Sequence, residues 1–170
     1  MLDCETHKGK MAIDEELKTL DAIDAMGYVV AKTKNNNHPC DAIILVSKEG
    51  RLYVHGVAEI KTRQRPLTYE YIVKNGYLIT NKKITNGRKH GIILGVPFYI
   101  FVRIVGDARL LMWKVTESDG QYCFRYETKM SSTQATINGG KAIRENAYLP
   151  GDRMQVFHIE PEKIRENGYL

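Results

Sequence analysis

The sequence has little of what marks secreted, membrane or fibrous proteins. Its 170 residues include three cysteines, an odd and widely spaced set that implies no disulfide framework. No segment approaches the run of about 20 apolar residues that spans a bilayer. The first ten residues lack the apolar core of a secretory signal, and the sequence has no internal repeat. We therefore expect an intracellular, cytoplasmic protein without a membrane partner.

What is present is the composition of an ordinary globular protein, with 43% hydrophobic and 26% charged residues. The length suits one domain with a substantial buried core. Lysine and arginine together number 25 against 20 acidic residues, which gives a formal net charge of +5. This excess permits a polyanionic partner such as DNA but does not require one.

Periodicity and turn residues divide the chain into helices and strands. Apolar residues at helical spacing predict one helix over 14–26, with Asp14 as its N-cap. A second helix is predicted over 80–94, although Asn86-Gly87 weakens that prediction. Strands are predicted over 28–31, 41–46, 51–62, 97–102 and 110–115. The order of these elements predicts an α/β fold with a central mixed sheet flanked by helices.

The two ends of the chain have weaker patterns. Residues 1–13 are expected to form a mobile terminus ahead of a core over 14–116. Residues 117–170 are expected to form a β-rich extension packed on the same domain. That extension has a turn at 118–120 followed by a short strand, a polar loop over 131–140, and a final strand near Met154.

The chemistry of the chain is concentrated at one Glu-x-Lys triplet. The sequence contains three such triplets: Glu16/Lys18, Glu59/Lys61 and Glu127/Lys129. Only the second ends a strongly apolar strand, in a predicted hairpin whose first strand begins with Asp41. The third is expected to be a solvated hairpin, because its strand is less apolar and no periodic helix follows it.

Strand geometry predicts that the aspartate and the triplet share a face of the sheet. Side chains alternate along a strand, so Glu59 and Lys61 point the same way. Taking Lys48-Glu49-Gly50 as a three-residue turn pairs Ser47 with Arg51, and this register extends to Asp41. The aspartate then lies diagonal to Glu59, at roughly 7–8 Å between backbones. A two-residue turn would place the two carboxylates on opposite faces.

Two carboxylates on one face suit a hard cation such as Mg²⁺ or Mn²⁺, which prefers oxygen ligands. Such an ion lowers the pKa of a bound water and neutralises charge on a phosphate. A lysine beside the ion can position the water and offset developing negative charge. Asp41, Glu59 and Lys61 are therefore the candidate catalytic residues.

The segment Pro39-Cys40-Asp41, then 17 intervening residues, then Glu59-Ile60-Lys61 resembles the signature of the PD-(D/E)XK nucleases. Cys40 interrupts the usual proline–aspartate pair. The resemblance covers roughly residues 14–105 and implies a restriction-endonuclease-like αβββαβ core, as in resolvase-like and small phage or prokaryotic members. It also implies Mg²⁺- or Mn²⁺-dependent cleavage of DNA, as an endo- or exonuclease that is structure-specific in some members.

The same resemblance implies roles for further residues. Asp41, Glu59 and the Ile60 carbonyl would hold the metal, and Glu16 on the first helix would join them, with Glu15 as the second choice. Residues on the second helix, here Lys82 and Lys83, would touch DNA or the site. Cutting both strands of a duplex often uses two sites, so a homodimer is compatible with this function.

Basic side chains near the proposed site are predicted to contact phosphates, with strong salt dependence. They are Lys34, Arg63, Arg65, Lys82 and Lys83. The two lysines of the predicted second helix lie in its first turn, where the helix dipole disfavours cations, and this favours a functional role. Tyr69, Tyr71 and Tyr77 are candidates for stacking on bases, although packing is the more common role of tyrosine.

Other interpretations of the same residues remain open. The three site residues can be a solvated ion pair on a surface hairpin. The domain can also be a nucleic-acid-binding module that keeps a nuclease fold without chemistry, or a protein-binding accessory or inhibitor. Cys4, His7, His38 and Cys40 offer a zinc set, but their spacing is not that of a standard structural site.

Overall fold

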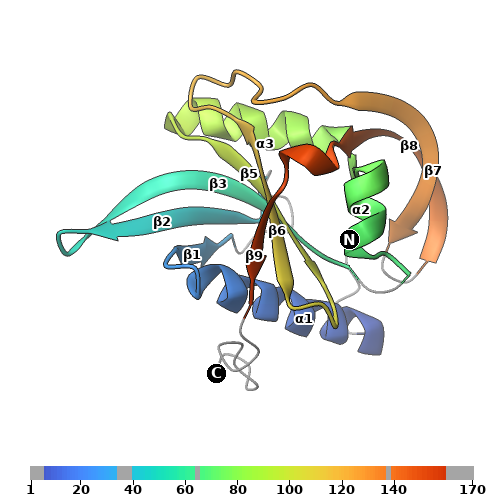
Figure 1. The fold of residues 1–170 in the computed structure, drawn as a ribbon, viewed down its shortest axis with the longest axis horizontal. Coiled ribbons are helices and arrows are strands. Elements are labelled where there is room, and N and C mark those ends of the chain that lie inside the picture. The colour runs from blue at the N-terminus through green and yellow to red at the C-terminus, as the bar shows by residue number, and fades with distance from the viewer. Residues whose placement is uncertain (1–5, 34–39, 64–65, 137–138, 160–170) are drawn as a thin grey trace.

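A six-stranded mixed sheet forms the centre of the molecule (Figure 1). The structure is a computed structural model that describes residues 6–33, 40–63, 66–136 and 139–159. The strand order is β1-β2-β3-β5-β6-β9, with β3 and β5 parallel and the other neighbours antiparallel. The strands are β1 (Val29–Lys32), β2 (Ala42–Lys48), β3 (Arg51–Arg63), β5 (Phe98–Ile104), β6 (Arg109–Thr116) and β9 (Gln155–His158).

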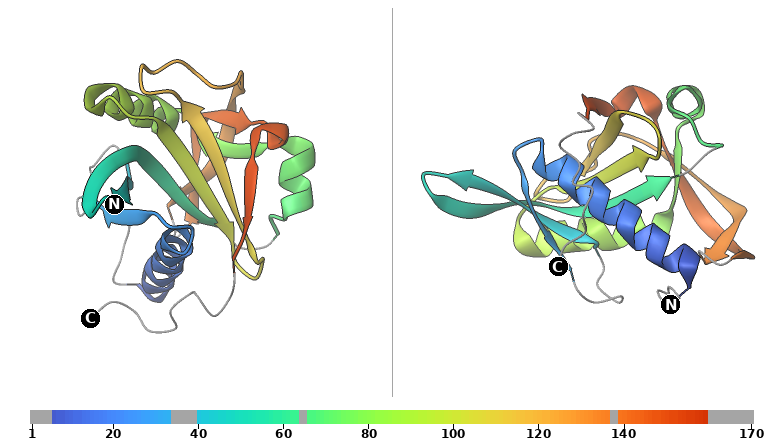
Figure 2. Two further views of the ribbon diagram at one scale, coloured as in Figure 1. Left: turned by 60° about the vertical axis from the view of Figure 1, so that its left-hand side comes forward. Right: turned by 90° about the horizontal axis from the view of Figure 1, so that it is seen from below.

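Two long helices cover opposite faces of this sheet, α1 (His7–Asp24) on one and α3 (Asn81–Leu94) on the other (Figure 2). Leu20 and Ile23 of α1 pack in one apolar cluster with Ile60. Ile84 of α3 packs in a second cluster with Val57, whose side chain points to the other face of β3. No helix in the described part of the chain is long and apolar enough to cross a membrane.

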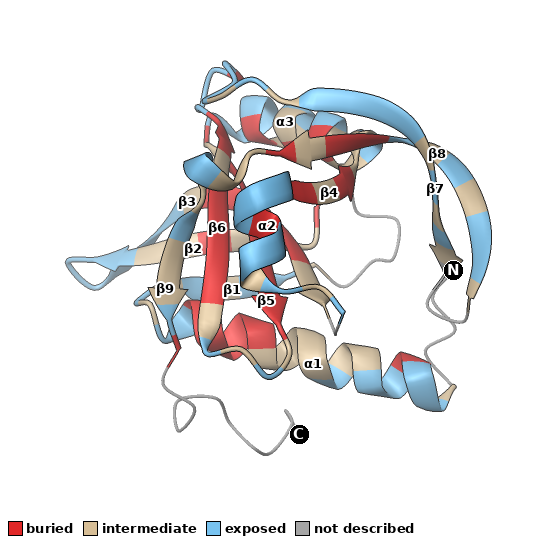
Figure 3. Ribbon diagram, turned by 45° about the vertical axis from the view of Figure 1, so that its right-hand side comes forward, coloured by how far each residue is buried: buried red, intermediate tan, exposed pale blue. Residues whose placement is uncertain are grey.

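A second, three-stranded sheet lies on the α3 side, in the order β4-β8-β7. Its strands are β4 (Tyr77–Thr80), β8 (Gly139–Leu149) and β7 (Glu127–Thr136), and the short helix α2 (Tyr69–Asn75) precedes β4. Strands β7 and β8 continue beyond β4 as a two-stranded ribbon that arches away from the core (Figure 1). Figure 3 shows that this ribbon is largely exposed, whereas β5 and β6 are buried.

The C-terminal extension is the part that sequence patterns predicted least well. The polar loop predicted over 131–140 is wrong where the structure describes it, because those residues belong to the ribbon. The strand predicted after the turn at 118–120 is also wrong, since Tyr122 forms only an isolated bridge with Thr116. The ribbon is exposed along much of its length, and its strands show no apolar alternation for a sequence pattern to detect.

The first helix begins earlier than predicted. Thr6 is the N-cap, and its Oγ1 accepts a hydrogen bond from the Gly9 N–H at 3.0 Å. The predicted cap, Asp14, lies inside the helix and pairs with Lys18 at 2.8 Å. The prediction of a mobile terminus is therefore wrong from His7 onward, while residues 1–5 lie outside the described residues.

The other predicted core elements are confirmed to within a few residues. They include the helix predicted over 80–94, although Asn86-Gly87 lies within it. Gly87 has a packing role there, because α3 approaches β5 closely at this point. A Cβ at residue 87 would lie 2.2–2.6 Å from three ring atoms of Phe98, whose side chain is fully buried. The glycine therefore permits the contact that seats α3 on the sheet.

We predict that Gly87→Ala lowers the free energy of unfolding by about 1–2 kcal/mol. Overpacking costs about 1–3 kcal/mol, and alanine in a helix recovers at most about 1 kcal/mol over glycine. Urea denaturation measures the change, with Asn86→Ala on the same helix as the control. A Gly87→Ala protein at least as stable as wild type would contradict the close packing of α3 on Phe98.

Candidate active site

The β2–β3 hairpin decides whether Asp41 and Glu59 share a face. The three-residue turn predicted at 48–50 is wrong: Lys48 pairs with Arg51, and the turn has two residues, Glu49 and Gly50, both with positive φ. This is the backbone of the tight hairpin turns whose twist matches that of the strands. On its own, such a turn would separate the two carboxylates.

A β-bulge restores the shared face. Leu45 pairs with Val54, but Ile44 pairs with Gly56, so His55 is an extra residue in β3. The extra residue shifts the register by one, and Ala42 pairs with Ala58. His55 is stacked between aromatic rings, 5.4 Å from Tyr28 and 5.7 Å from Tyr99 between centroids. Asp41 and Glu59 therefore share a face, as the sequence predicted, but through a two-residue turn and a bulge instead of a three-residue turn.

The Asp41 carboxylate lies directly over the end of β3. Its Oδ2 accepts a hydrogen bond from the Ile60 N–H at 3.0 Å and lies 3.1 Å from the Lys61 Nζ. The Asp41 N–H donates to the Ala58 carbonyl at 2.9 Å. These contacts fix the aspartate from both its backbone and its side chain.

Glu59 is the buried centre of the cluster, with no exposed surface. Its Oε1 lies 2.5 Å from the Nζ of Lys61 and 2.9 Å from the Nζ of Lys83. Its Oε2 accepts a hydrogen bond from Lys83 at 3.2 Å, and Lys83 also lies 3.7 Å from Asp41 Oδ1. The site therefore contains two carboxylates and two ammonium groups, drawn from β3, α3 and the residue before β2.

Burial and charge act in opposite directions on these groups. Burial raises the pKa of Glu59, and the nearby lysines only partly offset that effect. Burial also acts against ionisation of Asp41, but Lys61, Lys83 and the Ile60 N–H outweigh it, so the pKa of Asp41 is lowered. For Lys61 burial favours the neutral amine, yet Glu59 and Asp41 prevail and raise its pKa. Lys61 is therefore a cation at neutral pH.

The donor set fits a hard cation that keeps several waters. Glu59 Oε1 faces the ammonium groups of Lys61 and Lys83, at 2.5 and 2.9 Å, and has no other hydrogen-bond partner within the described residues. Within the described residues no group of three or more His, Cys, Asp and Glu side chains gathers to hold a metal. Mg²⁺ needs only one or two protein carboxylates when water and phosphate complete its shell. Asp41 and Glu59 provide that number.

The structure does not bring Glu16 into this cluster. Glu16 is on α1, which covers the opposite face of the sheet, and its carboxylate pairs with Lys32 of β1 at 2.7 Å. Glu15, the second choice, pairs with the guanidinium of Arg103. Helix α1 packs on the face of β3 that carries Ile60, whereas Glu59 and Lys61 point to the other face. Strand alternation therefore separates the carboxylates of Glu15 and Glu16 from that of Glu59.

The predicted phosphate-binding residues have different placements. Lys83 is in the cluster itself, and Lys82 is exposed in the same first turn of α3. Arg63 lies 5.7 Å from the ring centroid of Tyr77 and donates to the Thr62 carbonyl. Lys34 and Arg65 lie outside the described residues.

The sequence predicted that Lys83 would touch DNA or the site, but it did not predict the pairing of Lys83 with Glu59. Its signal in the sequence was a lysine at the start of a helix, where the dipole disfavours a cation. The buried carboxylate of Glu59 offsets that cost. Burial also raises the pKa of Tyr77, which lies near the two charged groups of Lys61 and Glu59.

The third Glu-x-Lys triplet and the zinc candidates are the remaining candidates from the sequence. Glu127 and Lys129 form an exposed ion pair at 2.9 Å, as expected of a solvated hairpin. Of the zinc candidates, Cys4 and His38 lie outside the described residues. Cys40 is buried, and burial raises the pKa of its thiol to about 11, which disfavours the thiolate that zinc would bind.

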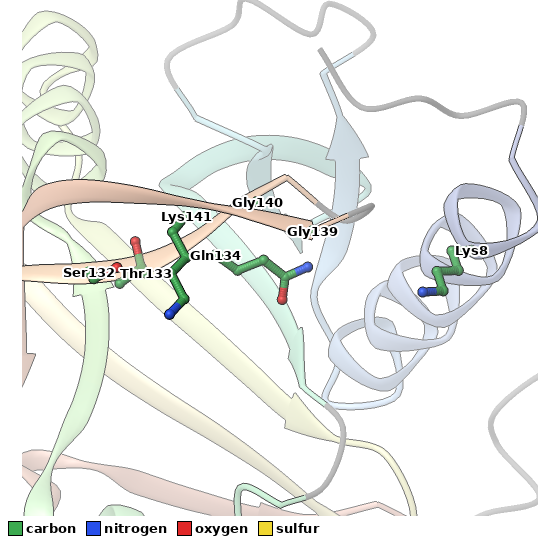
Figure 4. Close-up of a pocket in the computed structure, with 7 residues that line it drawn as sticks. All are labelled: Lys8, Ser132, Thr133, Gln134, Gly139, Gly140 and Lys141. Carbon is green, nitrogen blue, oxygen red and sulfur yellow. The ribbon is translucent and has the colours of Figure 1, made fainter.

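Described residues line at least two clefts outside the cluster. One of 380 Å³ separates the start of α1 from the tip of the β7–β8 ribbon (Figure 4). Lys8 of α1 and Gln134 of β7 extend toward the space between them, and Lys141 of β8 lies on the same ribbon. The other cleft has a volume of 800 Å³ and lies between α2 and the base of the ribbon.

No protein-family model matches the chain, and no curated protein matches it. The chemistry of the site therefore has to be argued from the geometry of Asp41, Glu59, Lys61 and Lys83.

The two carboxylates are predicted to have opposite effects on the pH dependence of stability. The lowered pKa of Asp41 stabilises the fold above its ordinary value of 3.8 and loses this contribution as pH falls. The raised pKa of Glu59 stabilises the fold below its ordinary value of 4.5 and loses this contribution as pH rises. The wild type should therefore gain stability over Asp41→Asn, and lose stability relative to Glu59→Gln, as pH rises from about 3 to 7.

Urea denaturation at about pH 3, 5 and 7 measures both differences. Asp14→Asn, which changes an exposed carboxylate on α1, is the control. Parallel pH profiles for Asp41→Asn and Glu59→Gln would contradict the different environments of the two carboxylates.

Proposed function

We propose that the protein is a metal-dependent deoxyribonuclease of the PD-(D/E)XK type, which hydrolyses phosphodiester bonds of DNA with Mg²⁺ or Mn²⁺. The observation that carries the proposal is the convergence of Asp41, Glu59 and Lys61 on one face of one hairpin, with Lys83 closing the cluster. The resemblance to the PD-(D/E)XK signature therefore extends from the spacing of residues in the sequence to the positions of their side chains.

The arrangement of elements also supports this class. Helix α1 is followed by the antiparallel strands β1, β2 and β3, and α3 then precedes β5, which is parallel to β3. This is the αβββαβ order that the resemblance implies, with α2 and β4 inserted before the second helix. We propose that the fold is restriction-endonuclease-like on this ground.

Each residue has a role that follows from its contacts. Asp41 and Glu59 would hold the metal, with the Ile60 carbonyl, which lies 2.9 Å from the Lys61 Nζ, at the same place. A bound ion would lower the pKa of a water and neutralise charge on the phosphate. Lys61 is an ammonium, so it would donate hydrogen bonds to the attacking water or the phosphate rather than accept a proton.

Lys83 would act as a second phosphate contact. It is the more exposed of the two lysines and reaches Glu59 from α3. Both lysines balance the carboxylates, and this balance lowers the cost of burying Glu59. If Asp41 and Glu59 held a cation, Lys61 and Lys83 would be available to the negative charge of DNA.

One observation favours a second candidate, a module on the same fold that binds nucleic acid without cleaving it. The two carboxylates are already matched by two lysines, and no third acidic or histidine ligand joins them among the described residues. Incubation of supercoiled plasmid with Mg²⁺ and, in parallel, with EDTA distinguishes the two. Cleavage only with Mg²⁺ supports the enzyme, and binding without cleavage supports the module.

Asp41→Ala is predicted to abolish plasmid cleavage with Mg²⁺ or Mn²⁺ while retaining the fold, because it removes a metal ligand from the edge of the buried cluster. Gel analysis of plasmid and circular dichroism measure the two properties. Asp14→Ala, which removes a carboxylate from α1, should cleave as the wild type does. Cleavage by the Asp41→Ala protein at the wild-type rate would reject the nuclease assignment.

Lys61→Ala is predicted to reduce turnover by about 10²–10³-fold, because it removes a donor that acts on charge developing in the transition state. Binding of duplex DNA in EDTA should change much less, since other cations contact the backbone. Lys18→Ala is the matched control, because Lys18 also belongs to a Glu-x-Lys triplet but pairs with Asp14 and Glu15. Unchanged turnover in Lys61→Ala would remove this lysine from the mechanism.

A further inference from the structure

A cleft of 800 Å³ lies between α2 and the base of the β7–β8 ribbon, bordered by the short helix η1 (Gly151–Arg153). None of the four residues of the catalytic cluster lines it. The second sheet separates the two sites, because Tyr77 and Leu149 pack toward the core while Tyr148, the neighbour of Leu149, faces the cleft. The cleft is therefore a separate feature of the surface.

Three tyrosines line this cleft: Tyr71 of α2, Tyr126 just before β7, and Tyr148 of β8. The Tyr71 residue is 56% exposed and has the apolar Val73 beside it, 48% exposed. The two other tyrosines suggested by the sequence are used in packing, since Tyr77 is buried and Tyr69 lies under the guanidinium of Arg109. Of the three tyrosines that the sequence suggested for stacking, Tyr71 is thus the one whose ring is available to a ligand.

Cations surround these rings. Lys74, Arg125 and Lys129 line the cleft, against two acidic residues, Glu127 and Asp152. Lys129 pairs with Glu127 at 2.9 Å and lies 5.6 Å from the ring centroid of Tyr148. Asp152 pairs with Arg153. Within the described residues, Lys74 and Arg125 have no ion-pair partner, so their charge is available to an anion.

We infer that this cleft binds an unpaired strand of nucleic acid. Aromatic rings beside unpaired cations suit a ligand that carries flat bases and phosphates at short repeat, and stacking on tyrosine needs no particular base. A duplex presents its phosphates but keeps its bases inside, so it would use the cations and not the rings. The inference deepens the proposed function, and rests on it for the choice of DNA: the substrate would carry a single-stranded segment in addition to the bond that is cut.

Fluorescence anisotropy of a labelled 15-residue oligo-dT, measured in EDTA so that no cleavage occurs, tests the inference. Tyr71→Ala should weaken binding by about tenfold through loss of stacking, and Tyr71→Phe should restore it. Lys74→Ala should make the negative slope of log affinity against log salt shallower by about 0.7, the value for one phosphate contact on a single strand. Tyr53→Ala is the matched control, since Tyr53 is 47% exposed on the distant β2–β3 hairpin.

Three results would overturn the inference. The first is wild-type affinity in Tyr71→Ala. The second is equal competition by a blunt duplex and by oligo-dT. The third is a larger loss of affinity in Lys141→Ala than in Tyr71→Ala, which would assign the strand to the cleft of Figure 4. Because binding is measured without metal, a nuclease assignment rejected by Asp41→Ala would leave this test intact.

Discussion

The burial of the Glu59 carboxylate is the constraint on which the rest of the site depends. A carboxylate without exposed surface is costly unless cations or hydrogen bonds compensate it. Lys61 supplies one cation from the same strand, and Lys83 supplies the other from α3. The electrostatic requirement of one side chain therefore holds the start of a helix against the end of a strand. Asp41 joins the same lysines, which connects the β2–β3 hairpin to the arrangement.

Asp41 and Glu59 share a face of the β2–β3 hairpin, as predicted, although the predicted pairing register was wrong. A two-residue turn and a one-residue bulge at His55 together have the same effect on side-chain alternation as a longer turn without a bulge. The bulge is packed rather than loose, since His55 stacks with Tyr28 and Tyr99. Aromatic packing on one side of the sheet thus fixes the direction of a carboxylate on the other.

Local chemistry made part of the site predictable. Asp41, Glu59 and Lys61 are recognisable because the triplet ends an apolar strand in a hairpin whose first strand begins with Asp41. Lys83 is recognisable because it places a cation in the first turn of a helix. Glu16 shows where such reasoning ends. Glu16 is on the helix that the family resemblance places beside the site. However, α1 packs on the opposite face of the sheet, and Glu16 pairs there with Lys32. The side of a sheet that a helix covers depends on contacts distant in sequence.

Sequence by itself determined the mixed α/β class, the core strands and the side-chain alternation that groups Glu59 with Lys61, since these follow from short-range periodicity. Tertiary structure alone decided the bulge, the contact of Lys83 with Glu59 and the ribbon of β7 and β8. The ribbon lacks an apolar pattern and much of it is exposed, and its strands are defined by pairing with each other and with β4. Pairings of this kind join residues far apart in the chain, and local composition does not encode them.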